Sequence, residues 1–334
     1  MTLCYRDAQG RKVSPKRECD SIYWLARVPV HLTILRAVSV VMLLCWSSAG
    51  QDDAGKTEDP KSVSAPASAN SPGQNVLTSP PSIQDNSFLI EEAYNQEDGV
   101  IQHISVFQHS WVSSDWVYTL TDEWPVRGRK HQLSFSISGV DVSGLTNSGL
   151  GWGDTALNYR YQLMGDGQAK VAISPRLTTL MPTGDWKLGR GTGSFGLQTN
   201  FPVSIQHGRR LVTHWNAGAT WIPGARNTEG QRAGIVGVNF GQSFVWLASS
   251  RINALLETTW SSTEQPIGNG ITERRHDLFI SPGVRWAYNF KNGLQIVPGV
   301  GLPVGVGPAS GNRALILYLS FEHPFRWVRS NREN

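Results

Sequence analysis

One stretch of this 334-residue chain fits a nucleotide-binding motif letter for letter. Residues 191–196 read Gly-Thr-Gly-Ser-Phe-Gly, which matches G-x-G-x-x-G. In a dinucleotide site these glycines open a helix whose N-terminus holds the pyrophosphate. Here the motif follows a polar loop and opens an alternating, strand-like pattern. We therefore expect the glycines to serve a flexible loop and a bent strand start, with no nucleotide or other cofactor bound.

The positions of the histidines and cysteines give little support for a metal site or a catalytic site. All three cysteines, Cys4, Cys19 and Cys45, fall in the first 49 residues, so the remainder has no cysteine ligand for a metal. The later histidines show no ligand spacing: His103, His109, His131, His207, His214, His276 and His323. A metal site assembled across strands and a hydrolase that combines His214 with a neighbouring serine and a carboxylate remain open. No nucleophile motif is visible, and we predict no catalytic residue, no metal and no enzymatic activity.

A set of polar and charged side chains recurs on one face of the alternating segments. Its members are Arg160, Arg176, Gln198, Asn200, His214, Asn216, Glu257 and Arg285. Two interpretations stay open: a polar ladder that lines a solute path, or a mutually hydrogen-bonded interior that fills a narrow barrel. Mixed charge in a narrow pore would act against bulky solutes more than against simple ions.

Long alternating strands are the elements that must position these side chains. Residues 156–163 place Leu157, Tyr159, Tyr161 and Leu163 on one face and polar residues on the other. The same period recurs in residues 194–206 and 277–290. Runs of about 8 to 14 residues match the length that a tilted strand needs to cross a bilayer.

Short turns alternate with longer polar loops along the chain. The turns lie at residues 165–167, 207–209, 248–250 and 291–293, and the loops at residues 141–153, 182–193, 223–234, 262–274 and 306–312. This order is typical of an up-and-down barrel with turns on the periplasmic side. A propeller also repeats regularly, but it would need four short strands in each period instead of two long ones. We predict an all-β, antiparallel transmembrane β-barrel of about 12 strands over residues 99–327, with a C-terminal tail at 328–334.

The charge and the targeting signals lie at the N-terminus. Seven of the 30 Lys and Arg but three of the 26 Asp and Glu fall in residues 1–49, so the remainder is neutral and favours no nucleic-acid partner. The apolar run at residues 37–46, followed by Ser47-Ser48-Ala49, predicts a signal peptide over residues 1–49 and export by the Sec pathway. Residues 50–87 have the composition of a disordered periplasmic linker.

The segment at residues 88–98 precedes the first strand and carries Glu91, Glu92 and Glu97. Its pattern favours about two turns of amphipathic helix. With an even strand count the segment begins on the periplasmic side, where it either folds into the lumen as a plug or lies against the rim. As a plug, its carboxylates would meet arginines such as Arg160, Arg176 or Arg285.

Several sequence segments carry a family resemblance. Residues 88–97 with 99–103, 153–161, 174–177 with 182–185, and 216–220 resemble the outer-membrane barrel family named for the MetA pathway of phenol degradation. The resemblance spans roughly residues 88–327. It implies a channel or transporter of the Gram-negative outer membrane for small, often aromatic or hydrophobic solutes, and it defines no functional residues. A closed structural barrel without transport, or an outer-membrane lipid hydrolase, are the alternatives.

Partners follow from the same expectation. We expect outer-membrane lipids and lipopolysaccharide around the barrel, a small-molecule solute inside it, and periplasmic chaperones and the barrel-assembly machinery during biogenesis. The aromatic end of the last strand, at Phe325 and Trp327, resembles the signal that this machinery reads.

Overall fold

The computed structural model describes residues 87–126, 128–143, 149–290 and 294–324. The predicted signal peptide, most of the linker and the predicted C-terminal tail lie outside these residues and stay predictions. Helical structure in the described part is limited to two short 3₁₀ turns, η1 (Trp186–Leu188) and η2 (Gly307–Ala309). No helix there is long and apolar enough to cross a membrane.

Seventeen β-segments form one sheet in the described part of the chain, and every pairing in it is antiparallel. The segments are β1 (Val100–Ser110), β2 (Trp116–Pro125), β3 (His131–Asp141), β4 (Gly151–Trp152), β5 (Thr155–Tyr161), β6 (Val171–Ile173), β7 (Arg176–Met181), β8 (Gly196–Asn200), β9 (Val203–His207), β10 (Leu211–Arg226), β11 (Arg232–Leu247), β12 (Ile252–Gly268), β13 (Ile271–Trp286), β14 (Tyr288–Asn289), β15 (Gln295–Gly301), β16 (Val304–Gly305) and β17 (Ala314–Pro324).

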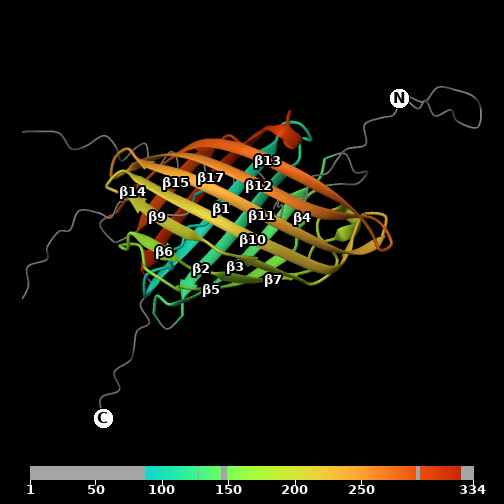
Figure 1. Ribbon diagram of the computed structural model, residues 1–334, viewed down its shortest axis with the longest axis horizontal. Coiled ribbons are helices and arrows are strands. Elements are labelled where there is room, and N and C mark those ends of the chain that lie inside the picture. The colour runs from blue at the N-terminus through green and yellow to red at the C-terminus, as the bar shows by residue number, and fades with distance from the viewer. Residues whose placement is uncertain (1–86, 127, 144–148, 291–293, 325–334) are drawn as a thin grey trace, which may run out of the picture. The chain divides into compact units, whose positions relative to one another are not determined.

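The sheet closes on itself. Strand β1 pairs with β2 on one side and with β17 on the other, in a register that joins Val100 to Pro324. Five pairs of consecutive segments, β4–β5, β6–β7, β8–β9, β13–β14 and β15–β16, are each the two parts of one strand, so that twelve strands make up the described barrel. Figure 1 shows the strands side by side. The predicted antiparallel barrel of about 12 strands is confirmed.

Side chains alternate between the interior and the outer surface, as the sequence period predicts. On β5, Leu157 and Tyr159 are exposed, whereas Asn158 and Arg160 are buried. On β11, exposed Phe244 and Trp246 flank buried Val245. The outer surface is therefore apolar, whereas the interior is largely polar. This is the arrangement of a barrel that faces lipid.

Two hairpins extend farther than the sequence predicts. The predicted long loops at 223–234 and 262–274 are wrong, because β10 pairs with β11 as far as Arg226↔Arg232 and β12 pairs with β13 as far as Gly268↔Ile271. Two features stabilise the extensions: an inward apolar cluster that includes Ile222 and Ile235, and an outward ion pair of Arg274 with Glu264 at 2.8 Å. Strand ends beyond an apolar belt need no outward apolar residues, so their polar sequence resembles that of a loop.

Two strands are interrupted where proline removes a backbone donor. Residues 174–175 separate β6 from β7, and residues 201–202 separate β8 from β9, so the continuous strand predicted over residues 194–206 is broken. The two interruptions lie side by side, since Ser174 N donates to Pro202 O at 3.2 Å. Pro175 and Pro202 have no N–H to donate, and the ladder between these neighbouring strands is locally incomplete.

Candidate functional site

The segment from Ser87 to Asp98 passes through the interior of the barrel. It contains no helix, which differs from the two turns that the sequence favours. Its backbone N–H groups instead donate to inward side chains of five different strand regions. These bonds are Leu89 N to Glu257 Oε1 at 2.9 Å, Ile90 N to the same oxygen at 3.2 Å, Glu91 N to Asn216 Oδ1 at 2.9 Å, Ala93 N to Ser204 Oγ at 2.8 Å, Asn95 N to Gln162 Oε1 at 2.8 Å and Gln96 N to Gln132 Oε1 at 2.7 Å.

These bonds explain why the helix does not form. A buried backbone donor needs a partner, and a helix is one way to supply it. Here the barrel wall supplies acceptors at a spacing that suits an extended segment. The segment also buries Phe88, Ile90, Ala93 and Tyr94, which a short isolated helix could not do on all sides at once.

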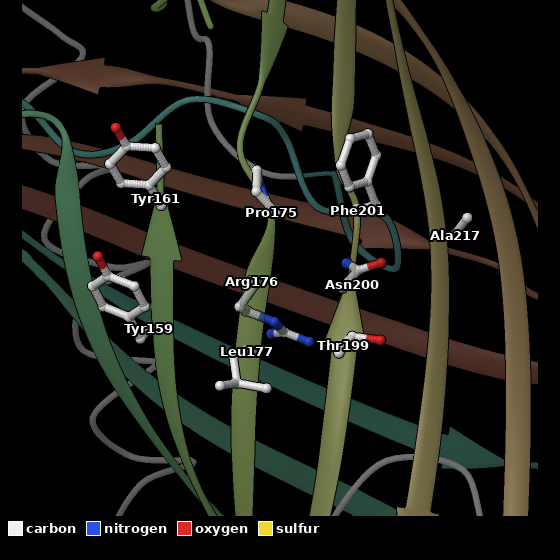
Figure 2. A pocket seen from close by; sticks show the side chains of 9 residues that line it. All are labelled: Tyr159, Tyr161, Pro175, Arg176, Leu177, Thr199, Asn200, Phe201 and Ala217. Carbon is white, nitrogen blue, oxygen red and sulfur yellow. The ribbon is translucent and has the colours of Figure 1, made fainter. Parts of the chain in front are cut away.

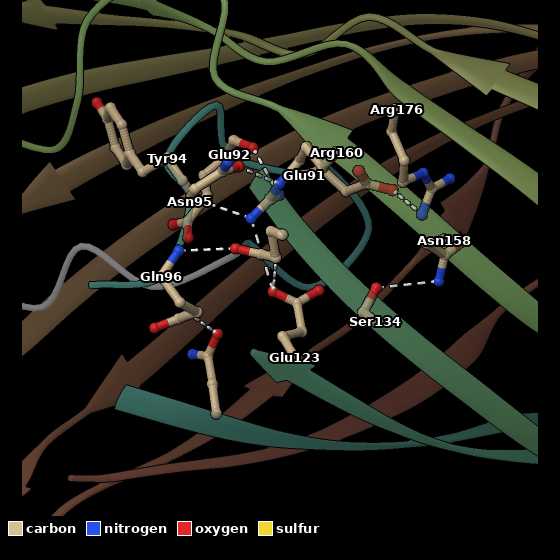
Figure 3. Close-up of polar contacts among 12 residues, drawn as sticks. Glu91, Glu92, Tyr94, Asn95, Gln96, Glu123, Ser134, Asn158, Arg160 and Arg176 are labelled. Atoms are coloured by element: carbon tan, nitrogen blue, oxygen red, sulfur yellow. Dashed lines mark hydrogen bonds and ion pairs between the residues drawn. The ribbon is translucent and has the colours of Figure 1, made fainter. Parts of the chain in front are cut away.

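Arg160 is the main donor to the carbonyl groups of the segment. Its guanidinium donates to Tyr94 O at 2.7 Å, to Glu92 O at 3.2 Å and to Asn95 Oδ1 at 3.0 Å, as Figure 3 shows. Glu123 Oε2 lies 3.6 Å from the same guanidinium. Gln162 and Asn216 add further bonds, Gln162 Nε2 to Ala93 O at 2.7 Å and Asn216 Nδ2 to Glu91 O at 2.8 Å. Donors and acceptors of the segment are thus both bound by the wall.

The acidic side chains of the segment have different surroundings. Glu91 forms an ion pair with Arg176 at 2.6 Å (Figure 3), and Arg176 also donates to Gln198 Oε1 at 3.0 Å. Glu92 is buried. Glu97 pairs at 3.0 Å with Arg129, which the sequence did not indicate, and both side chains are largely exposed. Of the arginines expected to meet these carboxylates, Arg176 forms such an ion pair and Arg160 binds backbone carbonyls of the segment.

The structure places six of the eight predicted interior residues in buried positions: Arg160, Asn200, His214, Asn216, Glu257 and Arg285. Arg176 and Gln198 are partly buried. Arg160, Arg176, Asn216 and Glu257 all contact the N-terminal segment directly. Asn200 joins this set indirectly, because its Nδ2 donates to Asn216 Oδ1 at 3.1 Å.

Several further residues belong to this network, and no local sequence pattern marks them as contacts of the segment. Gln132, Gln162 and Ser204 accept backbone bonds of the segment, and Glu123 lies beside Arg160. Strand parity was an available signal, since Gln162 shares the face of Arg160. Parity places a side chain inward, but it does not say which inward residue the segment will contact.

His214 does meet a serine, as the hydrolase alternative requires. Its Nδ1 lies 2.7 Å from Ser204 Oγ. Both residues are buried, and Ser204 Oγ also accepts the Ala93 N–H, so the pair holds the N-terminal segment. Among the described residues no carboxylate hydrogen-bonds to His214, and no group of three His, Cys, Asp or Glu side chains is arranged to hold a metal ion.

The glycine-rich motif at residues 191–196 belongs to a packed loop. Asp154 Oδ2 accepts both the backbone N–H and the hydroxyl of Thr192 at 2.8 Å, and Asp154 Oδ1 accepts Gly184 N–H at 3.0 Å. Gly193 has φ of 64° and packs against the ring of Trp186. The motif leads into strand β8. The glycines thus lie in a loop held by hydrogen bonds, where the sequence predicts a flexible one, and at the start of a strand.

An apolar groove of about 430 Å³ opens on the outer side of the wall, beside the two proline interruptions (Figure 2). Tyr159, Leu177 and Phe201 are exposed residues of its lining. Arg176 and Asn200, which reach the interior network, also border it. The lining suits an apolar molecule that approaches from the lipid side.

Comparison with known proteins adds to this geometry. No protein-family model matches the chain, and no curated protein matches it. The crystal structure of the COG4313 outer membrane channel from Pseudomonas putida F1 aligns with a TM-score of 0.55 and 15% identity, over 70% of this chain and 98% of that one. That likeness shows the fold. The barrel is thus similar in fold to an outer-membrane channel, whereas the resemblance to the phenol-degradation family stays a prediction.

Two further solved structures align more weakly. The CymD monoaromatic hydrocarbon channel has a TM-score of 0.37 and 10% identity, over 70% of this chain and 90% of that one. The beta domain of the Bordetella autotransporter BrkA has a TM-score of 0.39 and 13% identity, over 68% of this chain and all of that one. Similarity at this level carries no argument about the function of this chain.

Proposed function

We propose that this protein is an outer-membrane channel for the passive passage of small, hydrophobic or aromatic solutes, and that residues 88–97 plug it in the closed state. One observation carries the proposal: the closed barrel binds the backbone of the segment through hydrogen bonds to inward polar side chains. Each of those bonds can be exchanged for a bond to water or to another barrel residue. A barrel built only as a structural element would not need a removable filling.

The chemistry of the interior and of the outer groove supports the solute class. One part of the interior is an apolar cluster that includes Phe88, Ile104, Val297 and Tyr318. The groove on the outer side has an apolar lining as well. Apolar solutes would find favourable surface in both places, whereas the mixed charges of the remaining interior disfavour large polar ones.

Location and partners are part of the same proposal. A twelve-stranded barrel with an apolar outer surface requires a bilayer, and the predicted signal peptide would direct the chain to the outer membrane by the Sec pathway. We propose outer-membrane lipids and lipopolysaccharide as its surroundings. Periplasmic chaperones and the barrel-assembly machinery would act during its insertion.

Deletion of residues 88–97 tests the proposal in reconstituted liposomes. We expect the variant to fold, to conduct ions more strongly than the intact protein and to admit small solutes faster in a swelling assay. A ten-residue deletion at residues 60–69, within the predicted linker, is the matched control and should leave both measurements unchanged. A folded variant without residues 88–97 whose conductance and swelling equal those of the intact protein would support a closed structural barrel instead.

A further inference from the structure

Three glycines of the barrel wall make room for the ring of Phe88. A Cβ atom added to Gly283, Gly299 or Gly301 would lie 2.5, 2.6 and 2.8 Å, respectively, from ring atoms of Phe88. Any larger residue at these positions would therefore collide with the ring. Gly283 and Gly301 face each other across the pairing of β13 with β15, and Gly299 is the partner of Arg285 in the same ladder.

Apolar side chains complete this glycine slot, which we define by Gly283, Gly299, Gly301 and Tyr318. The ring centroid of Tyr318 lies 5.3 Å from that of Phe88, with the two planes tilted by 46°. This is within the range of favourable aromatic pairs. Ile316 and Val297 are fully buried in the same cluster. The slot thus has no side chains at its three glycines and is closed by the aromatic ring of Tyr318.

Glycine inside a strand lowers the stability of the strand. Three glycines around one ring therefore indicate that the space they leave has a use. Glycine weakens a strand through backbone entropy and the loss of a packing side chain, and it commonly marks a place where another group approaches closely. The approaching group here is a planar six-membered ring. The slot is also part of the wall alone, since all of its glycines lie on β13 and β15.

The ring of Phe88 is independent of the bonds that hold its segment. The backbone N–H groups of Leu89 and Ile90 anchor the segment on Glu257, whereas the phenyl ring of Phe88 carries no hydrogen-bonding group. Rotation of the Phe88 side chain would empty the slot without breaking these bonds. The anchor and the slot occupant can therefore be changed separately.

We propose that the glycine slot is a binding site for planar aromatic rings of about the size of benzene, which Phe88 occupies in the closed barrel. An aromatic solute binds by taking the place of the Phe88 ring. This inference rests on the proposed channel function and names both its solute class and the position where the solute binds. Phe88 acts as an internal competitor of the solute.

Phenol and cyclohexanol are a matched pair of probes, because they share a hydroxyl and a six-membered ring but only phenol is planar. We expect the full-length Phe88→Ala variant to bind phenol at least tenfold more tightly than the intact protein does in calorimetric titrations in detergent. Phenol should also bind this variant more tightly than cyclohexanol. Equal affinity of the variant and the intact protein for phenol, or equal affinity of the variant for both probes, would overturn the slot.

A second substitution tests the place of binding. A Cβ at Gly301 meets no atom other than those of the Phe88 ring within 3.4 Å. The double variant Phe88→Ala/Gly301→Ala therefore places a methyl group in the emptied slot without a new clash, and it should lose the gain in phenol affinity. Phenol binding that survives in the double variant would place the probe elsewhere and contradict the proposal.

The intact protein provides a test that does not depend on any variant folding. A crystal soaked in 4-bromophenol should show an anomalous bromine signal beside Gly299 and Gly301, with the Phe88 ring displaced. Bromine signal only at other positions would overturn the slot. Solute flux into liposomes is measured separately: phenol in the slot without flux would refute the channel, and flux without slot occupancy would refute the slot alone.

Discussion

Glu257 Oε1 accepts the backbone N–H of Leu89 at a distance of 2.9 Å, although 168 residues separate the two in the sequence. The same oxygen accepts the neighbouring N–H of Ile90. A single carboxylate on β12 thus fixes the start of the segment that fills the barrel.

Replacing Glu257 with Ala should loosen the N-terminal segment. Two buried N–H groups would lose their acceptor, at about 1 to 3 kcal/mol for each group left unsatisfied. We expect a lower free energy of unfolding and a higher single-channel conductance. Glu257→Gln keeps one carbonyl oxygen. We expect its free energy of unfolding and its conductance to lie between those of Glu257→Ala and those of the intact protein. Glu264→Ala on the same strand is the control: it removes a surface ion pair, and an equal rise in conductance there would contradict the assignment.

Arg160 and Arg129 form a matched pair, because both contact the N-terminal segment but only Arg160 is buried. The side chain of Arg160 is 4% exposed and that of Arg129 is 47% exposed. Arg160→Met removes the donor to three acceptors of the segment and the cation beside Glu123, and we expect a loss of about 3 to 5 kcal/mol. Arg129→Met breaks an exposed pair and should cost about 0.2 to 1 kcal/mol. Urea titration of folding into liposomes measures both; similar losses would be inconsistent with a buried anchor.

The cost of placing a charge on the outer surface of β5 should depend on its depth in the bilayer. Leu157 lies in the strand and faces outward, whereas Leu163 lies just beyond its end. Leu157→Arg should cost about 2 to 4 kcal/mol, and Leu163→Arg about 0 to 1 kcal/mol, as expected near the midplane and near the interface. The folded fraction of each variant is measured from the heat-dependent shift of the barrel band on gels, and it should be lower for Leu157→Arg than for Leu163→Arg. A larger loss for Leu163→Arg would mean that the apolar belt lies elsewhere.

Asp154 should hold the loop between β7 and β8 in place. Its carboxylate accepts hydrogen bonds from Thr192 and Gly184, and hydrogen bonds to charged groups contribute about 1.5 to 3 kcal/mol each. Asp154→Ala should raise the rate of tryptic cleavage after Lys187 and Arg190 by about tenfold or more, because the open fraction of the loop rises. Asp166→Ala removes an exposed turn carboxylate and should leave this rate unchanged. No change in Asp154→Ala would show that other contacts hold the loop.

Strand parity accounts for what the sequence alone determined. Alternation of side chains is a local property of an extended backbone, so the exposure of Leu157 and the burial of Asn158 and Arg160 follow from their order in the chain. Long strands joined alternately by turns and loops likewise indicate an antiparallel barrel. Parity is less informative where the outward residues become polar, so the ends of the extended hairpins at Arg226 and Gly268 have the sequence character of loops.

Only the tertiary structure decided how the interior is filled. The amphipathic pattern of residues 88–97 favours a helix when the segment is considered alone, because nothing local supplies other partners for its N–H groups. Closure of the barrel brings acceptors from strands far apart in sequence, such as Glu257 and Ser204, to successive N–H groups of an extended segment. The slot for Phe88 arises in the same way, since Gly283 and Gly301 become neighbours only when β13 pairs with β15. Contacts of this kind depend on the register and closure of the whole sheet, which no local pattern of residues specifies.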